Sequence, residues 1–202
     1  MNEVRIIAGQ CRGRRIHFHA NAGLRPSLDA VRETLFNWLM FKVKDANCLD
    51  AFAGSGALGC EALSRFAHRV LFIEHDRDSA AVLKKNIALL NLQHAGQVHY
   101  DSSLRYLAKE KPEPFDLIFL DPPFQTDLLE KSLKWIAERG WLAPEGLIYF
   151  EAERQFKIEA IIERQFSLYR HKTLGEVQFG LLSHSQSISG PSCHDPEQIC
   201  LG

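Results

Sequence analysis

Short apolar runs and longer amphipathic stretches alternate along most of this chain. The apolar runs predict strands at residues 47–51, 70–74, 97–100, 116–120 and 146–151. Between them, apolar side chains recur at intervals of three and four residues, as in Leu83, Ile87 and Leu90, which predicts helices at 57–65, 77–91, 103–109 and 127–138. This alternation is typical of repeated βαβ units, which build a parallel sheet with helices on both faces.

The N-terminal segment follows a different pattern. Apolar runs at 4–8 and 15–18 flank a basic, glycine-containing stretch, which favours a β-hairpin with arginines at its tip. After Ser27, which suits an N-cap, apolar residues fall at helical spacing and predict a helix at about 28–42. The segment is therefore expected to add a small hairpin and a helix to the sheet.

The C-terminal segment predicts a second hairpin and a tail. Residues 166–173 and 176–182 meet around Gly175 and favour an antiparallel hairpin at the edge of the sheet. Beyond residue 182, serine, histidine, glutamine, glycine and proline replace most apolar residues, so we expect a disordered tail.

Together these elements predict an α/β fold. Its centre is a Rossmann-like, doubly wound, mostly parallel seven-stranded sheet with a C-terminal antiparallel hairpin, and a small N-terminal β-hairpin and helix extend it. We divide the chain into an extension at 1–44, a core domain at 45–182 and a tail at 183–202. A chain of 202 residues with 46% hydrophobic content suits one such core and is short for two.

Composition points to a cytoplasmic protein without metal. The apolar runs are too short to span a bilayer, and the N-terminus has no secretory signal, so no membrane contact is expected. The five cysteines are scattered, with no Cys-x-x-Cys pair or histidine at zinc spacing, which indicates reduced thiols and no metal site. We expect a monomer.

Positive charge is concentrated at the start of the chain. The formal net charge is −1, but residues 1–44 hold eight Lys/Arg and three acids, a balance of +5. The remaining residues hold 16 basic and 22 acidic groups, a balance of −6. The extension is therefore a candidate surface for nucleic-acid phosphates, with an ordinary solvated face as the alternative.

A glycine-rich segment, Asp50 to Gly59, follows the first strand of the core and enters a helix. Open α/β sheets bind ligands at this place, and the glycines let the backbone approach a nucleoside closely. Gly54-x-Gly56-x-x-Gly59 is also the fingerprint of dinucleotide-binding enzymes, and a glycine-rich structural turn would look the same. The segment predicts a nucleoside cofactor without naming it.

Two acids follow the next two strands. Glu74 ends the second strand, twenty residues beyond Gly54, where a carboxylate can accept both hydroxyls of a ribose. Asp101 follows the third strand and could accept a hydrogen bond from the amino group of adenine. A surface acid in a first helical turn, or an N-cap, explains each residue in structural terms alone.

The tetrapeptide Asp121-Pro122-Pro123-Phe124 ends the fourth strand and discriminates better. The prolines stop the strand and offer no N–H, so the turn presents the Asp121 carboxylate and main-chain carbonyls as acceptors for an amino group. Phe124 can stack on a base. Such acceptors can orient the lone pair of an exocyclic base nitrogen toward a methyl donor. The alternative is a purely structural turn, made rigid by its prolines and followed by a phenylalanine of the core.

Taken together, these motifs resemble those of class I S-adenosylmethionine-dependent methyltransferases, and most of all the RsmD family, over about residues 3–182. This family methylates N2 of a guanine in 16S ribosomal RNA. The shared motifs are Arg5-Ile6-Ile7-Ala8-Gly9, Arg12-Gly13-Arg14, Arg25-Pro26-Ser27, Val31-Arg32-Glu33-x-Leu35-Phe36-Asn37-Trp38-Leu39, Asp50-x-Phe52-Ala53-Gly54-Ser55-Gly56-x-Leu58-Gly59, Glu61-Ala62-Leu63-Ser64-Arg65 and Asp121-Pro122-Pro123-Phe124.

The resemblance implies a role for each candidate residue. S-adenosylmethionine would be bound by Asp50, Phe52, Gly54, Gly56, Glu74 and Asp101. Asp121 and Pro122 would hold the target amino group, with Phe124 stacked on a guanine turned out of its helix or loop. The phosphates of 16S RNA, in an assembled or assembling small subunit, would be contacted by Arg5, Arg12, Arg14, Arg15, Arg25 and Arg32.

Three alternatives stay open. A nicotinamide or flavin enzyme would use the glycine-rich turn but leave the Asp121 turn unexplained. A non-catalytic RNA-binding protein could keep the same fold. Methyltransferases of adenine N6 in DNA or of a protein amide use a similar turn, and only the arginine-bearing extension favours ribosomal RNA over their substrates.

Overall fold

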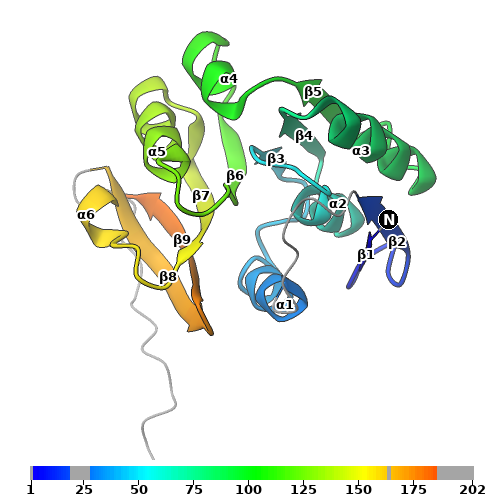
Figure 1. The fold of residues 1–202 in the computed structure, drawn as a ribbon, viewed down its shortest axis with the longest axis horizontal. Helices are drawn as coiled ribbons and strands as arrows, with labels where there is room; N and C mark the ends of the chain where they lie inside the picture. The colour runs from blue at the N-terminus through cyan, green and yellow to red at the C-terminus, as the bar shows by residue number, and fades with distance from the viewer. Residues whose placement is uncertain (1, 19–27, 163–164, 186–202) are drawn as a thin grey trace, which may run out of the picture.

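The structure is a computed structural model that describes residues 2–18, 28–162 and 165–185. A seven-stranded sheet forms its centre (Figure 1). The strands are β3 (Asn47–Asp50), β4 (Arg69–Glu74), β5 (Gly96–Tyr100), β6 (Phe115–Leu120), β7 (Leu142–Glu153), β8 (Phe166–Leu174) and β9 (Val177–His184). They lie in the order β5-β4-β3-β6-β7-β9-β8, which confirms the predicted α/β fold.

The sheet is parallel from β5 to β7 and antiparallel at its far edge. β9 lies between β7 and β8 and runs antiparallel to both, as the hairpin prediction required. From β3 the chain moves outward to β4 and β5, then returns to the other side of β3 to form β6. The strand order therefore reverses between β3 and β6, and ligands of open α/β sheets bind at the carboxyl ends of such a pair.

Helices cover both faces of this sheet (Figure 1). They are α1 (Leu28–Trp38), α2 (Ala57–Ser64), α3 (Arg77–Leu89), α4 (Ser103–Lys109), α5 (Leu128–Arg139) and α6 (Glu159–Ile162). One core cluster joins α1, α2 and α3 to the sheet through residues such as Leu35, Leu63 and Leu83. A second cluster joins α4, α5 and α6 to the other face through Leu107, Leu133 and Ile162.

An N-terminal hairpin packs on the α2 and α3 side. Its strands are β1 (Asn2–Arg5) and β2 (Arg15–Phe18), which pair antiparallel. Val4, Ile16 and Phe18 belong to the same buried cluster as α2 and α3. The first strand ends at Arg5, not at residue 8 as predicted, because the main-chain N–H groups of residues 7 and 8 donate to a side chain of α2 instead of to a strand.

Several boundaries differ from the prediction in the same limited way. α1 ends at Trp38, four residues early, and a turn follows. β9 continues through Ser183 to His184, since its backbone pairs with β8 whatever its side chains are. α6 was not predicted, because four residues are too few to show a period. The proposed Ser27 N-cap and most of the tail lie outside the described residues, and no described helix is long and apolar enough to span a membrane.

Candidate active site

The glycine-rich turn links the end of β3 to the start of α2 at the point where the strand order reverses. Gly54 and Gly56 have φ values of 49° and 79°, a left-handed backbone that favours glycine. A Cβ added at Gly54 would find its nearest neighbour, the carbonyl oxygen of Phe52, only at 4.0 Å. The main chain of this turn is therefore open to a ligand, as a nucleoside cofactor requires.

The other two glycines of the motif are needed for packing. A Cβ at Gly56 would lie 2.3 Å from Cδ1 of Leu83 on α3, and one at Gly59 would lie 2.2 Å from Cε1 of Phe72 on β4. Neither distance is tolerable. Gly59 thus lets α2 lie directly against β4, and Gly56 lets the turn before α2 lie directly against α3.

Asp50 ends β3 beneath this turn and is only 2% exposed. Its Oδ2 accepts a hydrogen bond from the N–H of Gly59 at 3.0 Å, so its carboxylate caps α2, whose N-cap residue Gly56 has no side chain. Burial raises the pKa of Asp50 to about 7; the Gly59 N–H opposes this shift and the charge of Glu74 adds to it. If Asp50 contacts the nucleoside cofactor as predicted, it does so with a carboxyl group that already accepts a hydrogen bond from the N-terminal turn of α2.

Glu74 ends β4 and joins two neighbouring turns. Its Oε2 accepts from the N–H of Gly54, and its Oε1 accepts from the N–H of Asp76, each at 2.7 Å. The side chain is 5% exposed. Each carboxylate oxygen has more than one acceptor direction, so Glu74 can hold the glycine-rich turn and still accept ribose hydroxyls.

Asp101 and Phe52 complete the predicted donor set. Asp101 follows β5, and its Oδ1 accepts from the N–H of Ser102 and from Nε of Arg105. Burial acts to raise the pKa of Asp101, but these two hydrogen bonds and the Arg105 charge outweigh burial and lower it, so the group is a ready acceptor. Phe52 lies half-buried in the glycine-rich turn, against the core under α4 and α5.

The Asp121 turn begins directly after β6, next to β3. Pro122 is buried, while Asp121 and Phe124 are partly exposed. A cavity of about 200 Å³ opens between this turn and the end of β7, lined among others by Pro122, Phe124 and Phe156. It is smaller than the roughly 300–1,000 Å³ of pockets that enclose drug-sized ligands, so it suits one planar group.

A larger cavity does not coincide with any predicted site residue. It measures about 890 Å³ and lies along the edge strand β5, near the starts of β4 and β6 at Arg69 and Phe115. The ligand-binding edge of a parallel sheet is the carboxyl edge, so we place the active site at the smaller cavity and the glycine-rich turn. Among the described residues no group of three His, Cys, Asp or Glu side chains could hold a metal ion.

Two residues on β7 that sequence reasoning missed lie beside the Asp121 turn. The Tyr149 hydroxyl donates to Oε2 of Glu151 at 3.0 Å, and both residues are buried. Burial raises the pKa of Tyr149 well above its usual range, and the charges of Glu151 and Asp121 add to this effect. A signal was present, because Glu151 closes the strand predicted at 146–151, just as an acid closes or directly follows each of the other four parallel strands.

The predicted RNA-binding arginines have unequal surroundings. Arg5 and Arg12 are exposed, and Arg15 is exposed with an ion pair to Glu3 at 2.7 Å. Arg14 is exposed and donates to the carbonyl of Leu89 at the end of α3. The position of Arg25 lies outside the described residues.

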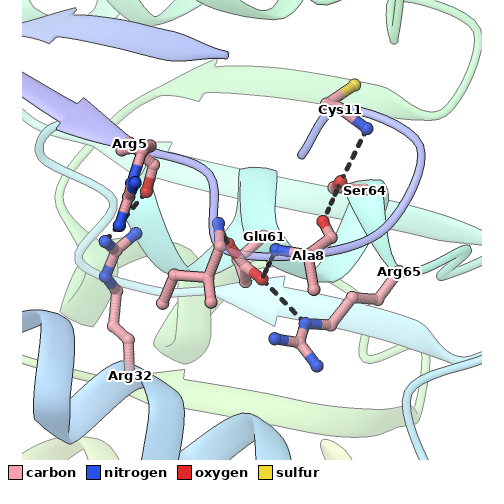
Figure 2. Close-up of polar contacts among 8 residues, drawn as sticks. Arg5, Ala8, Cys11, Arg32, Glu61, Ser64 and Arg65 are labelled. Atoms are coloured by element: carbon pink, nitrogen blue, oxygen red, sulfur yellow. Dashed lines mark hydrogen bonds and ion pairs between the residues drawn. The ribbon is translucent and has the colours of Figure 1, made fainter. Parts of the chain in front are cut away.

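Arg32 is different, because it is buried. The residue is only 2% exposed, and its Nη2 donates to the carbonyl of Arg5 at 3.0 Å (Figure 2). The same Nη2 donates to Asp29 at 2.6 Å. Its guanidinium therefore joins α1 to the end of β1. Contact with an RNA phosphate would require this group to leave its position in the structure.

A polar clamp on α2 holds the hairpin tip, residues 6–14 (Figure 2). Glu61, fully buried, accepts from the N–H groups of Ile7 at 2.7 Å and Ala8 at 3.0 Å, and from Nε of Arg65 at 2.7 Å. Ser64 donates to the carbonyl of Ala8 and accepts from the N–H of Cys11. These contacts fasten the extension to the helix that begins at the glycine-rich turn.

The tip also satisfies carbonyl groups that end two helices. The main-chain N–H of Gln10 donates to the carbonyl of Ser64, and its side chain donates to that of Leu63. The carbonyl of Leu89 accepts from Arg14. Since the last carbonyls of a helix have no partner within it, the tip caps α2 and α3 at the ends that lie away from the glycine-rich turn.

Known proteins are similar to this chain over most of its length. A model of the protein family described as Conserved hypothetical protein 95 matches residues 4–183. The chain is 45% identical over 179 residues to ribosomal RNA small subunit methyltransferase D of Escherichia coli K12, with 89% of each covered. It is 45% identical over 181 residues to the protein of that name from Haemophilus influenzae, covering 89% of this chain and 93% of the relative. The solved structure of yhhF from Escherichia coli superposes with a TM-score of 0.81 at 44% identity, covering 91% of this chain and 98% of the other.

Proposed function

Since this chain belongs to the RsmD family of S-adenosylmethionine-dependent ribosomal RNA methyltransferases, we propose that it methylates the exocyclic N2 of one guanine in 16S ribosomal RNA. The observation that carries the proposal is the position of the Asp121 turn. It ends β6, the strand beside β3, whose own end bears the glycine-rich turn. The turn proposed to hold the amino group and the turn proposed to bind the donor thus follow neighbouring strands, at the place where the strand order reverses.

The residues around the glycine-rich turn fit the donor. The open main chain at Gly54 lets a nucleoside approach, and Glu74, which already bridges the turns after β3 and β4, faces the place expected for ribose hydroxyls. Asp101 would accept from the adenine amino group, and Phe52 would line the same site. Asp50 would hold the N-terminal end of α2 in place and face the methionine portion. S-adenosylmethionine would supply a methyl group bonded to a sulfonium sulfur. As the substrate nitrogen forms its bond to the methyl carbon, the S–C bond would break and sulfur would keep the electron pair.

The Asp121 turn prepares the nitrogen for that transfer. The lone pair of an amino group on a purine is delocalised into the ring, which makes the nitrogen a poor nucleophile. The Asp121 carboxylate and the Pro122 carbonyl accept the two N–H bonds and orient the lone pair out of the ring plane. Once the new N–C bond forms, the cationic nitrogen releases one proton, and Asp121 can accept it. Phe124 stacks on the base and fixes its plane.

The substrate is RNA in an assembled or assembling small subunit. Arg5, Arg12 and Arg15 are exposed and would contact its phosphates. Arg14 and Arg32 bind main-chain carbonyls, so their first role in this proposal is to hold the extension in place. The target guanine would leave its helix or loop to reach the cavity beside Phe124.

The deciding experiment offers radiolabelled S-adenosylmethionine to 16S RNA, both free and in small subunits assembled without the modification, and maps the labelled base. Label on N2 of a single guanine is expected. Label on adenine N6 or on a ribosomal protein would replace the proposed substrate, and no label on any component would refute it.

Asp121→Ala tests the residue roles in the same assay. The variant should bind S-adenosylhomocysteine with wild-type affinity in calorimetry but lose methyl transfer by about 10³-fold, because only the nucleophile has lost its holder. Glu130→Gln, on the exposed surface of α5, is the matched control. Wild-type turnover by Asp121→Ala would remove its assigned role.

A further inference from the structure

An acid ends or directly follows each of the parallel strands β3, β4, β5 and β6, and β7 carries one, Glu151, just beyond its last residue paired with β6. Four of these acids have a place in the proposed function: Asp50, Glu74, Asp101 and Asp121. The fifth, Glu151 on β7, has none. It is 6% exposed, and buried carboxylates are rare unless they are hydrogen-bonded or used.

The strand register puts Glu151 beside Asp121. β6 and β7 are parallel, and Phe119 faces Tyr149 while Leu120 faces Phe150. Continuing this register by one residue brings Asp121 opposite Glu151, about 4.8 Å away across neighbouring strands. Because side chains alternate along a strand, the same continuation puts Asp121 on the face of Phe119, and Glu151 lies on the face of Tyr149, which is the same face.

Glu151 also lines the cavity that the Asp121 turn forms. Pro122, Phe124 and Glu151 border this space of about 200 Å³ together. The Tyr149 hydroxyl donates to Oε2 of Glu151 at 3.0 Å, which fixes the rotation of the carboxylate. Since burial keeps the pKa of Tyr149 high, this hydroxyl stays protonated and remains a donor throughout the neutral range.

The edge of guanine that bears N2 matches two adjacent carboxylates. Guanine presents a ring N1–H next to its N2 amino group, so three donor hydrogens point to one side. Adenine presents an unprotonated N1 next to its N6 amino group, and a carboxylate oxygen facing that lone pair would receive no hydrogen bond from the ring nitrogen and would be repelled by it. Sites built to hydrogen-bond a particular group discriminate strongly against analogues that lack it.

We propose that Glu151 is a specificity-determining residue that selects guanine by accepting its N1–H, while Asp121 holds the neighbouring amino group. Tyr149 then acts as a positioning residue for Glu151. The inference rests on the proposed function, because it needs a base seated beside Phe124 with its amino group toward Asp121. It adds the reason why the turn, which suits any exocyclic amino group, accepts one base.

The test compares guanine with 2-aminopurine at the mapped position of 16S RNA, introduced by splinted ligation and assembled into subunits. 2-Aminopurine keeps the amino group but has no hydrogen on N1. The wild-type protein should prefer guanine by about 100-fold in kcat/KM. In Glu151→Gln the amide can donate to the bare N1, so this preference should fall by about 10-fold or more, through loss on guanine and gain on 2-aminopurine.

Matched variants separate specificity from folding. Glu145→Gln makes the same change at the exposed start of β7 and should keep the wild-type preference. Glu151→Asp retains the charge and should keep the preference at a lower rate. Thermal unfolding and S-adenosylhomocysteine affinity should stay close to wild type in Glu151→Gln, because its amide oxygen can still accept from Tyr149.

Each outcome decides one question. An unchanged ratio of kcat/KM on guanine to kcat/KM on 2-aminopurine in Glu151→Gln overturns the inference. The proposed function still stands in that case if the wild-type protein labels N2 of guanine. Equal losses on both bases also overturn it, because they indicate a structural role alone. Absence of label on guanine N2 in the wild-type protein refutes the proposed function itself, and that result is read from the unsubstituted RNA.

Discussion

The fully buried Glu61 carboxylate provides the sharpest test of how the extension is attached. Its Oε2 accepts from the N–H of Ile7, and its Oε1 accepts from the N–H of Ala8 and from Nε of Arg65 (Figure 2). Glu61→Gln keeps the volume but replaces one acceptor oxygen by an NH₂ donor. One of the two partly buried main-chain N–H groups must then face another donor.

The size of the effect follows from these contacts. An unsatisfied buried donor costs about 1–3 kcal/mol, and loss of a charge-assisted hydrogen bond costs about 1.5–3 kcal/mol more. The side chain of Arg65 is 17% exposed, so water can replace its lost hydrogen bond to Glu61 only in part. We expect a loss of about 3–5 kcal/mol, the amount typical of removing one member of a buried pair, which is large beside a total stability of about 5–15 kcal/mol.

Urea unfolding, thermal unfolding and amide hydrogen exchange measure this loss of stability. The midpoint of thermal unfolding should fall by about 10 °C, and the amides of Ile7 and Ala8 should lose protection before those of β3 and β6. Glu33→Gln, on the exposed side of α1, should change neither quantity. A loss below about 1 kcal/mol for Glu61→Gln, with the two amides still protected, would show that the clamp does not hold the extension.

Two further predictions concern the donor site and the RNA surface. The pKa of Asp50 is raised from 3.8 to about 7 in the folded protein, so ionising this carboxyl costs free energy of folding. As pH rises from 4 to 7, Asp50→Asn should therefore gain stability relative to wild type, by up to about 4 kcal/mol. Urea unfolding without S-adenosylmethionine should show a larger difference at pH 8 than at pH 4.5, and a constant difference would contradict the prediction. In the double variant Arg5→Gln with Arg12→Gln, the magnitude of the slope of log affinity for 16S RNA against log salt concentration should fall by about 1.5. Lys134→Gln on the opposite face should leave the slope unchanged. A wild-type slope in the double variant would exclude these arginines from the RNA surface.

Periodicity was sufficient to predict the sheet and its ligand edge. The parallel strands carry apolar runs that end in an acid, and the helices between them show a clear three- to four-residue period. Because parallel strands all point the same way, the ends of β3, β4, β5 and β6 must gather Asp50, Glu74, Asp101 and Asp121 at one edge. The position of these four residues at one edge followed from this rule without any knowledge of contacts, while their roles stay predictions.

Contacts between distant segments could not be predicted in the same way. Glu61 looked like one acid in a short helix, and nothing local indicates that its partners lie 54 and 53 residues earlier. Arg32 looked like an exposed cation for the same reason. Glu151 was overlooked although it ends the strand predicted at 146–151, because its position beside Asp121 depends on the register between β6 and β7, which no pattern within a single strand contains.

The attachment of the hairpin also changes how its charge should be read. The sequence placed arginines at a free tip, but the tip caps α2 and α3 at the ends that lie away from the glycine-rich turn, and Arg14 donates to the carbonyl of Leu89. A helix of eight residues separates the two places by about 12 Å. Phosphates held near Arg12 would therefore lie about one length of α2 away from the glycine-rich turn. A substrate that contacts both places must extend beyond the target nucleotide.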